Sequence, residues 1–142
     1  MRHSIRCAAS ILVSTVVHAS AVDRSESPVL VTPILSTSTT ATGQPIVLPS
    51  QHAHVLVWIY DIAPGATLPE HKHPHPRYAY VLAGTLRITE SQAGRSLVYR
   101  PGDFIVEAIG QWQQAESLNN EPVRLLVIDQ LPGDVPNTVL HE

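Results

Sequence analysis

The chain has 142 residues, enough for one ordinary domain, and 44% of them are apolar, enough to bury a core. Lys and Arg number 9 and Asp and Glu number 12, so the net charge is −3 and no basic excess is present for nucleic-acid binding. Twelve prolines argue against a helical bundle, because proline lacks the N–H that a helix interior needs. Eight histidines are a surplus for this size, and they direct the search for a site.

Residues 1–21 have the three parts of a secretory signal peptide. Arg2 and Arg6 precede an apolar run at 7–17, and Ala19-Ser20-Ala21 forms a cleavage site of small residues. The run is shorter than the roughly 20 residues of a membrane anchor, and a short amphipathic helix is the alternative. We expect a mature chain that is periplasmic or secreted and not held at the membrane, with 7 basic and 12 acidic residues and no cysteine.

Residues 22–43 are rich in Ser, Thr and Pro, which predicts a flexible arm with at most one edge strand at 28–35. Residues 44–142 show an all-β pattern of short apolar runs between Gly and Pro turns. The stretch at 111–117 is ambiguous, and the run at 53–62 is apolar enough to predict a well-buried strand. The other predicted strands are 78–82, 85–89, 97–100, 104–109 and 123–131. This spacing predicts a single sandwich or barrel.

Three of the histidines lie close together in His71-Lys72-His73-Pro74-His75. Side chains two residues apart point to the same face of an extended chain, so the imidazoles of His71 and His73 can meet at one ion. Imidazole nitrogen suits Zn, Cu, Fe and Ni. The alternative is a proline-rich surface loop. We assign the isolated pair His52 and His54 to a polar strand entrance, and His141 to the surface.

The surroundings of this cluster resemble the first conserved motif of the cupin family. The spacing is Gly65, five residues, His71, one residue, His73, three residues, Arg77, six residues, Gly84. The family has Gly, five, His-x-His, three or four, Glu, six, Gly. A second stretch resembles the second motif: Pro101-Gly102-Asp103, then Gly110 and Gln113. The resemblance covers about residues 48–130 and implies an all-β fold, a single cupin-type jelly-roll β-barrel.

The resemblance also implies a divalent metal ion inside the barrel, which would be Fe, Mn, Zn, Cu or Ni. His71 and His73 match two of the four ligand positions. Arg77 stands where the family has glutamate, and an arginine side chain stays protonated and cannot be a ligand. Gln113 stands where the family has a histidine, and it can offer a carbonyl oxygen. Glu107 in the apolar run 104–109 is the best substitute acid, with an outward-facing strand position as the alternative.

We assign three further side chains to a ligand pocket. Arg77 can pair with Glu107 or with a substrate carboxylate. His75 can turn inward, although the neighbouring prolines fix the backbone around it. Tyr80 can line the pocket, with packing as the alternative.

Two functions follow from these residues. The first is an exported metal-dependent enzyme, an oxygenase or isomerase for a small molecule, whose catalytic residues the sequence does not identify. The second is a protein without catalysis that binds or senses an anionic small ligand near Arg77, with a degenerate metal site. A structural β-domain with a vestigial site is the third reading. The resemblance further implies a homodimer, and the sequence itself offers only apolar β-strands whose edges need cover.

Overall fold

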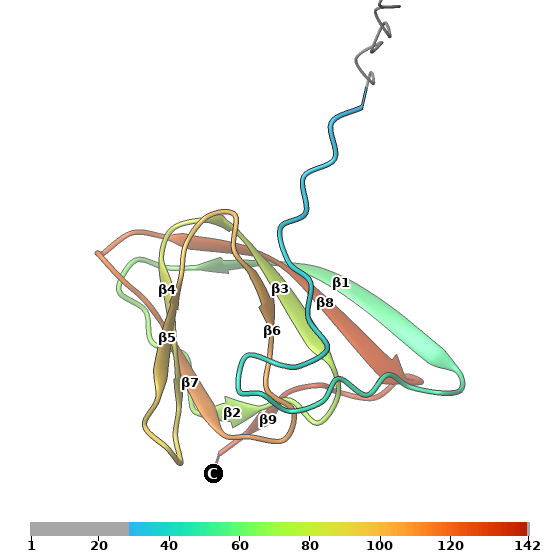
Figure 1. Ribbon diagram of the computed structural model, residues 1–142. Coiled ribbons are helices and arrows are strands. Elements are labelled where there is room, and N and C mark those ends of the chain that lie inside the picture. Colours follow the sequence, from blue (N-terminus) through green and yellow to red (C-terminus); the bar gives the residue numbers. More distant parts are fainter. Residues whose placement is uncertain (1–28, 142) are drawn as a thin grey trace, which may run out of the picture. The chain divides into compact units, whose positions relative to one another are not determined.

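The computed structural model describes residues 29–141 of the chain (Figure 1). The predicted signal peptide and residues 22–28 of the predicted arm lie outside the described residues. Residues 29–35 form no strand, since Pro33 lacks the N–H that would join a ladder. In the part of the chain described here, no helix is long and apolar enough to cross a membrane.

Within residues 29–141, nine strands form two antiparallel sheets (Figure 1). One sheet has the order β1 (Ala53–Ile62), β8 (Val123–Pro132), β3 (Arg77–Ala83) and β6 (Phe104–Val106). The other has the order β5 (Ser96–Tyr99), β4 (Leu86–Glu90), β7 (Gln113–Ser117), β2 (His71–Lys72) and β9 (Val139–Leu140). The predicted all-β jelly-roll is confirmed. The stretch at 111–117, which the sequence left ambiguous, contains β7.

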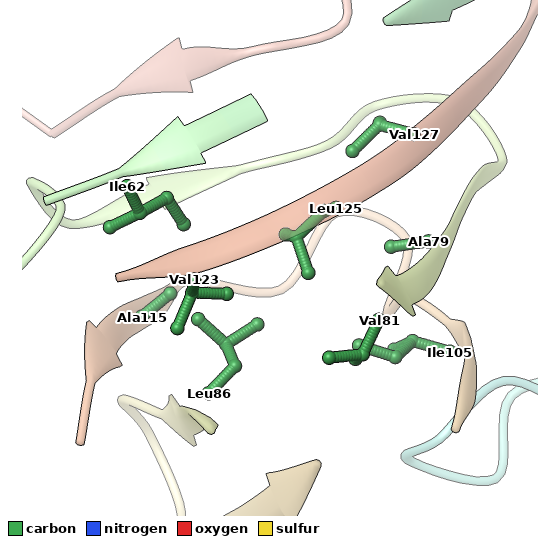
Figure 2. Packing of buried hydrophobic residues seen from close by; sticks show 9 residues of the cluster. All are labelled: Ile62, Ala79, Val81, Leu86, Ile105, Ala115, Val123, Leu125 and Val127. Atoms are coloured by element: carbon green, nitrogen blue, oxygen red, sulfur yellow. The ribbon is translucent and has the colours of Figure 1, made fainter. Parts of the chain in front are cut away.

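The apolar core lies between the sheets, where inward-facing residues of both meet. Figure 2 shows its nine members: Ile62, Ala79, Val81, Leu86, Ile105, Ala115, Val123, Leu125 and Val127. Val123, Leu125 and Val127 occupy alternate positions of β8, as the period of two in a strand requires. Each buried side chain of this kind contributes about 1.5–3 kcal/mol. The same inward row continues to Asp129, so a carboxylate lies where the apolar core ends.

The strand β1 corrects one expectation of the sequence analysis. It lies at the edge of its sheet and pairs only with β8 (Figure 1). Val55, Val57 and Ile59 are 52%, 58% and 47% exposed, so the strand is not well buried. Alternation places these three residues on the outer face of the sheet, and an unbroken apolar run does not reveal that one face is uncovered.

Two local features hold the barrel in shape. Gly84 has a φ of +75°, and a Cβ there would overlap the carbonyl oxygen of Pro122, so only glycine fits this turn.

The last part of the predicted arm and the residue that follows it are docked on the barrel. The amide of Ala41 donates to the carbonyl of Val106 at 2.8 Å, and the Gln44 side chain makes two hydrogen bonds with the backbone of Ile109, at 2.8 and 2.9 Å.

Candidate metal centre

The two predicted histidine ligands lie together inside the barrel. His71 is on β2, opposite Gln113 of β7, and His73 follows two residues later. They are 7% and 1% exposed. Their ring centroids are 4.9 Å apart, with the ring planes at 62°. The His-x-His spacing therefore brings two buried imidazoles side by side.

Backbone carbonyls select the tautomer of both rings. The Nδ1 of His71 lies 2.7 Å from the oxygen of Pro69, and the Nδ1 of His73 lies 2.6 Å from the oxygen of Asn137. A carbonyl oxygen only accepts, so each Nδ1 carries the hydrogen and each neutral ring has its lone pair on Nε2. The Nε2 of His73 is buried and has no hydrogen-bond partner. Histidines that bind metals are commonly oriented in this way, with the second nitrogen bonded to a carbonyl.

Glu107 completes this group from the end of β6. Its side chain is buried, which excludes the outward-facing alternative. Its Oε2 accepts a hydrogen bond from the Gln113 amide at 2.7 Å and lies 3.0 Å from the Nε2 of His73, without the alignment of a hydrogen bond. Burial would raise the pKa of Glu107, but His73, Arg77 and Gln113 together lower it below its ordinary value. The carboxylate of Glu107 therefore faces the Nε2 of His73 across 3.0 Å, a gap that needs a cation, either a proton on Nε2 or a metal ion, to be stable.

The pKa of His71 is also lowered, because burial disfavours its charged form and outweighs the hydrogen bond to Pro69. The neutral ring is the form that can bind a metal. His71 is therefore ready to act as a nitrogen donor at neutral pH.

Arg77, in the position of the family's glutamate, is engaged by Asp129. Its Nε lies 2.7 Å from Oδ1 of Asp129, and its Nη2 lies 2.9 Å from Oδ2. Asp129 also accepts hydrogen bonds from Asn137 at 2.6 Å and from Trp58 at 3.1 Å. Burial would raise the pKa of Asp129, but the bonds from Arg77 and Asn137 lower it. Asp129 is thus the partner of Arg77, in place of the Glu107 or substrate carboxylate considered from the sequence.

A cavity of about 30 Å³ lies beside these groups, lined by His71, His73, Glu107 and Gln113 and by core side chains. This volume accepts a water molecule or an ion, whereas pockets for drug-sized molecules have roughly 300–1,000 Å³. On the other side of Glu107 and Gln113 is a second cavity of about 20 Å³ under Ala41 and Thr42 of the docked arm.

The remaining predicted residues lie in different places. Arg77 lines the interior cavity. His75 instead lines an outer groove of about 550 Å³ together with several prolines. Tyr80 alternates with the buried Ala79 and Val81 of β3, so it lies on the outer face of the sheet. The structure therefore brings together His71, His73, Arg77, Glu107 and Gln113, but not His75 or Tyr80.

Three residues of the site were missed by the sequence analysis. Asp129 is a lone acid in the apolar run of β8, the same signal that singled out Glu107. Asn137 lies in a short polar tail with no pattern to mark it. Tyr60 lines the cavity, and the Arg77 guanidinium lies 5.7 Å from its ring.

The donor set fits a metal ion only in part. Within residues 29–141, no three His, Cys, Asp or Glu side chains are arranged as a ready metal-binding group. The reason is chemical, since Arg77 and Gln113 occupy two of the four expected ligand positions. The nearest approach to such a group is His71, His73 and Glu107, where the unpartnered Nε2 of His73 and the carboxylate of Glu107 face each other.

Two facing antiparallel sheets around a histidine-lined interior define a small β-barrel of the jelly-roll class. The profile of the Cupin domain matches residues 58–129, half of the sequence, and the chain belongs to the cupin family. No curated protein sequence matches the chain.

Several solved structures share the fold. The polyketide cyclase RemF from Streptomyces resistomycificus is 20% identical, with a TM-score of 0.53 and 69% of each chain covered. A cupin-like protein from Thermotoga maritima is 16% identical, with a TM-score of 0.54 and 61% and 64% covered. The Bacillus subtilis oxalate decarboxylase, which has Mn(II) centres, is 24% identical, with a TM-score of 0.52 and 61% and 23% covered. The chain spans about a quarter of the length of the oxalate decarboxylases that it matches.

Proposed function

We propose that this protein binds one divalent metal ion through His71, His73 and Glu107 inside the barrel, and that the loaded site binds or acts on a small molecule. The observation that carries the proposal is the buried Nε2 of His73, which has no hydrogen-bond partner and lies 3.0 Å from the Oε2 of Glu107. Leaving such an atom unsatisfied is costly, and a metal ion would take both donors. A bound metal supplies a Lewis acid or, for Fe and Cu, a redox centre.

Each side chain has a distinct part in this proposal. His71 and His73 are neutral nitrogen donors whose orientation is held by carbonyls. Glu107 supplies the negative charge, and the Gln113 amide holds one of its oxygens in place. Two nitrogens and a carboxylate suit Fe, Mn, Zn, Cu or Ni. Because Asp129 neutralises Arg77, the guanidinium does not carry an uncompensated charge toward the ion.

The size of the interior cavity limits what can reach the proposed metal. About 30 Å³ admits a molecule the size of water or dioxygen. A larger substrate does not fit this cavity as it stands, so the site would have to open to admit one. An oxygenase has to admit its organic substrate as well as dioxygen, so the cavity volume favours neither an oxygenase nor an isomerase.

The alternative function, anion binding without catalysis, loses its main support. It relies on a free guanidinium at Arg77, and both Nε and Nη2 of that group are bonded to Asp129. An anion would have to bind through the Nη1 side of the guanidinium and share that group with the buried carboxylate of Asp129.

Elemental analysis of purified protein tests the proposal. We expect about one divalent metal ion per wild-type chain and none in the His71→Ala/His73→Ala variant. The matched control is His52→Ala/His54→Ala, which removes the other His-x-His pair and should leave the metal content unchanged. Equal metal content in the wild-type protein and the His71→Ala/His73→Ala variant would overturn the site.

We also propose export, from the signal-peptide pattern of residues 1–21. The mature protein would be periplasmic or secreted and would begin at Val22. N-terminal sequencing of protein recovered outside the cytoplasm tests this, and an intact Met1 there would contradict it.

A homodimer is proposed on the outer face of the first sheet. Register places Val57 opposite Ile128, and Ile59 opposite Leu126, in two apolar rows that continue onto β3. An apolar edge strand beside an exposed apolar face is a surface that a second copy would cover. Light scattering should give twice the chain mass for the wild type and the single chain mass for Val57→Lys. A monomeric wild type would contradict the proposal.

A further inference from the structure

We propose that the C-terminal tail, residues 133–141, holds both histidines in their metal-binding orientation, and that Asn137 is its positioning residue. This inference rests on the metal site proposed above. The inference gives a role to a polar tail in which the sequence shows no motif. The family profile ends at residue 129, before this tail begins.

Asn137 makes three hydrogen bonds in three directions while being only 5% exposed. Its backbone oxygen accepts from the Nδ1 of His73 at 2.6 Å. Its side-chain Oδ1 accepts from the backbone amide of His75 at 2.9 Å. Its side-chain Nδ2 donates to Oδ1 of Asp129 at 2.6 Å. A single buried residue therefore fixes the ring of His73 and the backbone just beyond it.

The rest of the tail runs along His71. Strand β9 pairs with β2, with Leu140 opposite His71 and Val139 opposite Lys72, and Figure 1 shows the two strands next to each other. The amide of His141 donates to the carbonyl of Glu70 at 2.9 Å. Both proposed ligands are thus supported by the same tail, residues 133–141.

Apolar burial contributes little to holding the tail in place. Val139 is 39% exposed and Leu140 is 57% exposed, so β9 is bound mainly through its backbone. Segments with few buried apolar contacts open at low free-energy cost. The buried hydrogen bonds of Asn137, one of them to Asp129, therefore anchor the tail together with the β2–β9 pairing and the ring contact of His141 with Trp112, whose centroids are 4.8 Å apart.

This anchor gives Arg77 a role at the position where the family has a metal ligand. The two bonds from Arg77 hold Asp129 as a buried anion, and Asp129 in turn holds the Asn137 side chain. A hydrogen-bonded chain therefore runs from Arg77 through Asp129 and Asn137 to His73. Arg77, at a position where the family has a metal ligand, therefore helps to orient the proposed ligand His73.

The chemical consequence is the choice of tautomer. While the Asn137 oxygen accepts from Nδ1, the hydrogen of neutral His73 stays on Nδ1, and Nε2 offers a lone pair. Without that acceptor, the hydrogen would move to Nε2 and bond to the Oε2 of Glu107, 3.0 Å away. The Nε2 of His73 and the Oε2 of Glu107 would then be hydrogen-bonded to each other, and a metal ion would have to break that bond in order to bind.

The test compares Asn137→Ala with Thr138→Ala, a control at the adjacent exposed position of the same tail. The alanine at 137 keeps the backbone carbonyl but removes both side-chain anchors. We expect the Kd for Zn²⁺ and Mn²⁺, measured by calorimetry, to rise about 10- to 100-fold in Asn137→Ala, because the carbonyl of residue 137 is no longer held in place against the Nδ1 of His73. Thr138→Ala should bind like the wild type.

Nitrogen NMR of the metal-free protein gives a readout that does not depend on the metal. We expect His73 in the Nδ1–H tautomer in the wild type and in Thr138→Ala, and a shift toward Nε2–H in Asn137→Ala. An Nε2–H tautomer in the metal-free wild type overturns the inference, even if Asn137→Ala fails to fold. Unchanged Kd and tautomer in a folded Asn137→Ala also overturn it. A wild type with the expected tautomer that binds neither metal contradicts the proposed function instead.

Discussion

Two buried polar clusters lie inside this barrel, and they differ in how completely their polar atoms are satisfied. In the first cluster, Asp129 accepts four hydrogen bonds from Arg77, Asn137 and Trp58. In the second, His73 and Glu107 face each other at 3.0 Å, and the Nε2 of His73 has no hydrogen-bond partner.

This difference in hydrogen bonding distinguishes a cluster that supports the fold from a cluster that is a candidate binding site. Both oxygens of Asp129 are hydrogen-bonded and its charge is paired with Arg77, so the first cluster supports the fold. An unsatisfied buried group in a native protein calls for an explanation such as a bound ion. The second cluster, His73 and Glu107, is therefore the candidate site.

The largest expected effect comes from breaking the paired cluster. Arg77→Ala leaves the carboxylate of Asp129 buried without its cation, and the free energy of unfolding should fall by about 3–5 kcal/mol. The double variant Arg77→Met/Asp129→Leu removes both charges and should recover most of that loss. Urea unfolding measures all three proteins. A loss below about 1 kcal/mol in Arg77→Ala would show that the pair does not support the fold.

The second effect concerns the unsatisfied cluster. Metal at 100 times its Kd should stabilise the wild type by about 2.7 kcal/mol, through binding to the folded state alone. Glu107→Gln should lose most of this gain, because the ion loses its anionic donor. Without metal, the same variant should be less stable than the wild type, because His73, Arg77 and Gln113 favour the charged form of Glu107, but the loss should stay below that of Arg77→Ala.

Thermal unfolding with and without metal measures this pair of results, and Glu121→Gln at an exposed position is the control. If Glu107→Gln destabilises the metal-free protein as strongly as Arg77→Ala does, the two clusters are not different in kind.

The third effect is the pH dependence of the metal-free protein. Folding lowers the pKa of His71, so its contribution to stability is complete above 6.5 and is lost as the pH falls from there toward the folded-state pKa. Folding also lowers the pKa of Asp129, so its contribution is complete above 3.8 and is lost as the pH falls through the folded-state value. Unfolding free energies from pH 8 to 3 should therefore decline first through His71 and then, in the acidic range, through Asp129 and Glu107 together, since the pKa of Glu107 is also lowered.

His71→Ala should remove the first step and keep the second. A first step of unchanged size in that variant would assign it to another group.

The smallest effect is the titration of Tyr99, which lines the second cavity beside Glu107. Burial, with the charge of Glu107 adding to it, raises the pKa of Tyr99 to about 12. Ultraviolet absorbance should resolve this group, and Glu107→Gln should move its titration downward. An identical titration in that variant would mean that Glu107 is not ionised in the folded protein.

The fold class could be predicted from the sequence because most of the longer strands are apolar or alternating runs and the turns between them contain Gly and Pro. The prediction failed where tertiary contacts decide. Strand β1 is apolar throughout, and only the sheet order shows that one face is uncovered. Strands β2 and β9 have two residues each, too few for any period.

The site was predictable where a residue contrasts with its surroundings. His71 and His73 stand in a motif, and Glu107 is an acid in an apolar run. Asp129 gives the same contrast and could have been found by it. The role of Asn137 could not, because its bond to His73 joins residues 64 positions apart in the chain.

Anomalous diffraction from crystals of the metal-loaded protein tests the central claim most directly. The account predicts one metal ion in the interior cavity, with the Nε2 atoms of His71 and His73 as ligands at about 2.0–2.2 Å and an oxygen of Glu107 beside them. An anomalous peak elsewhere in the protein, or none in the barrel at saturating metal, would contradict it.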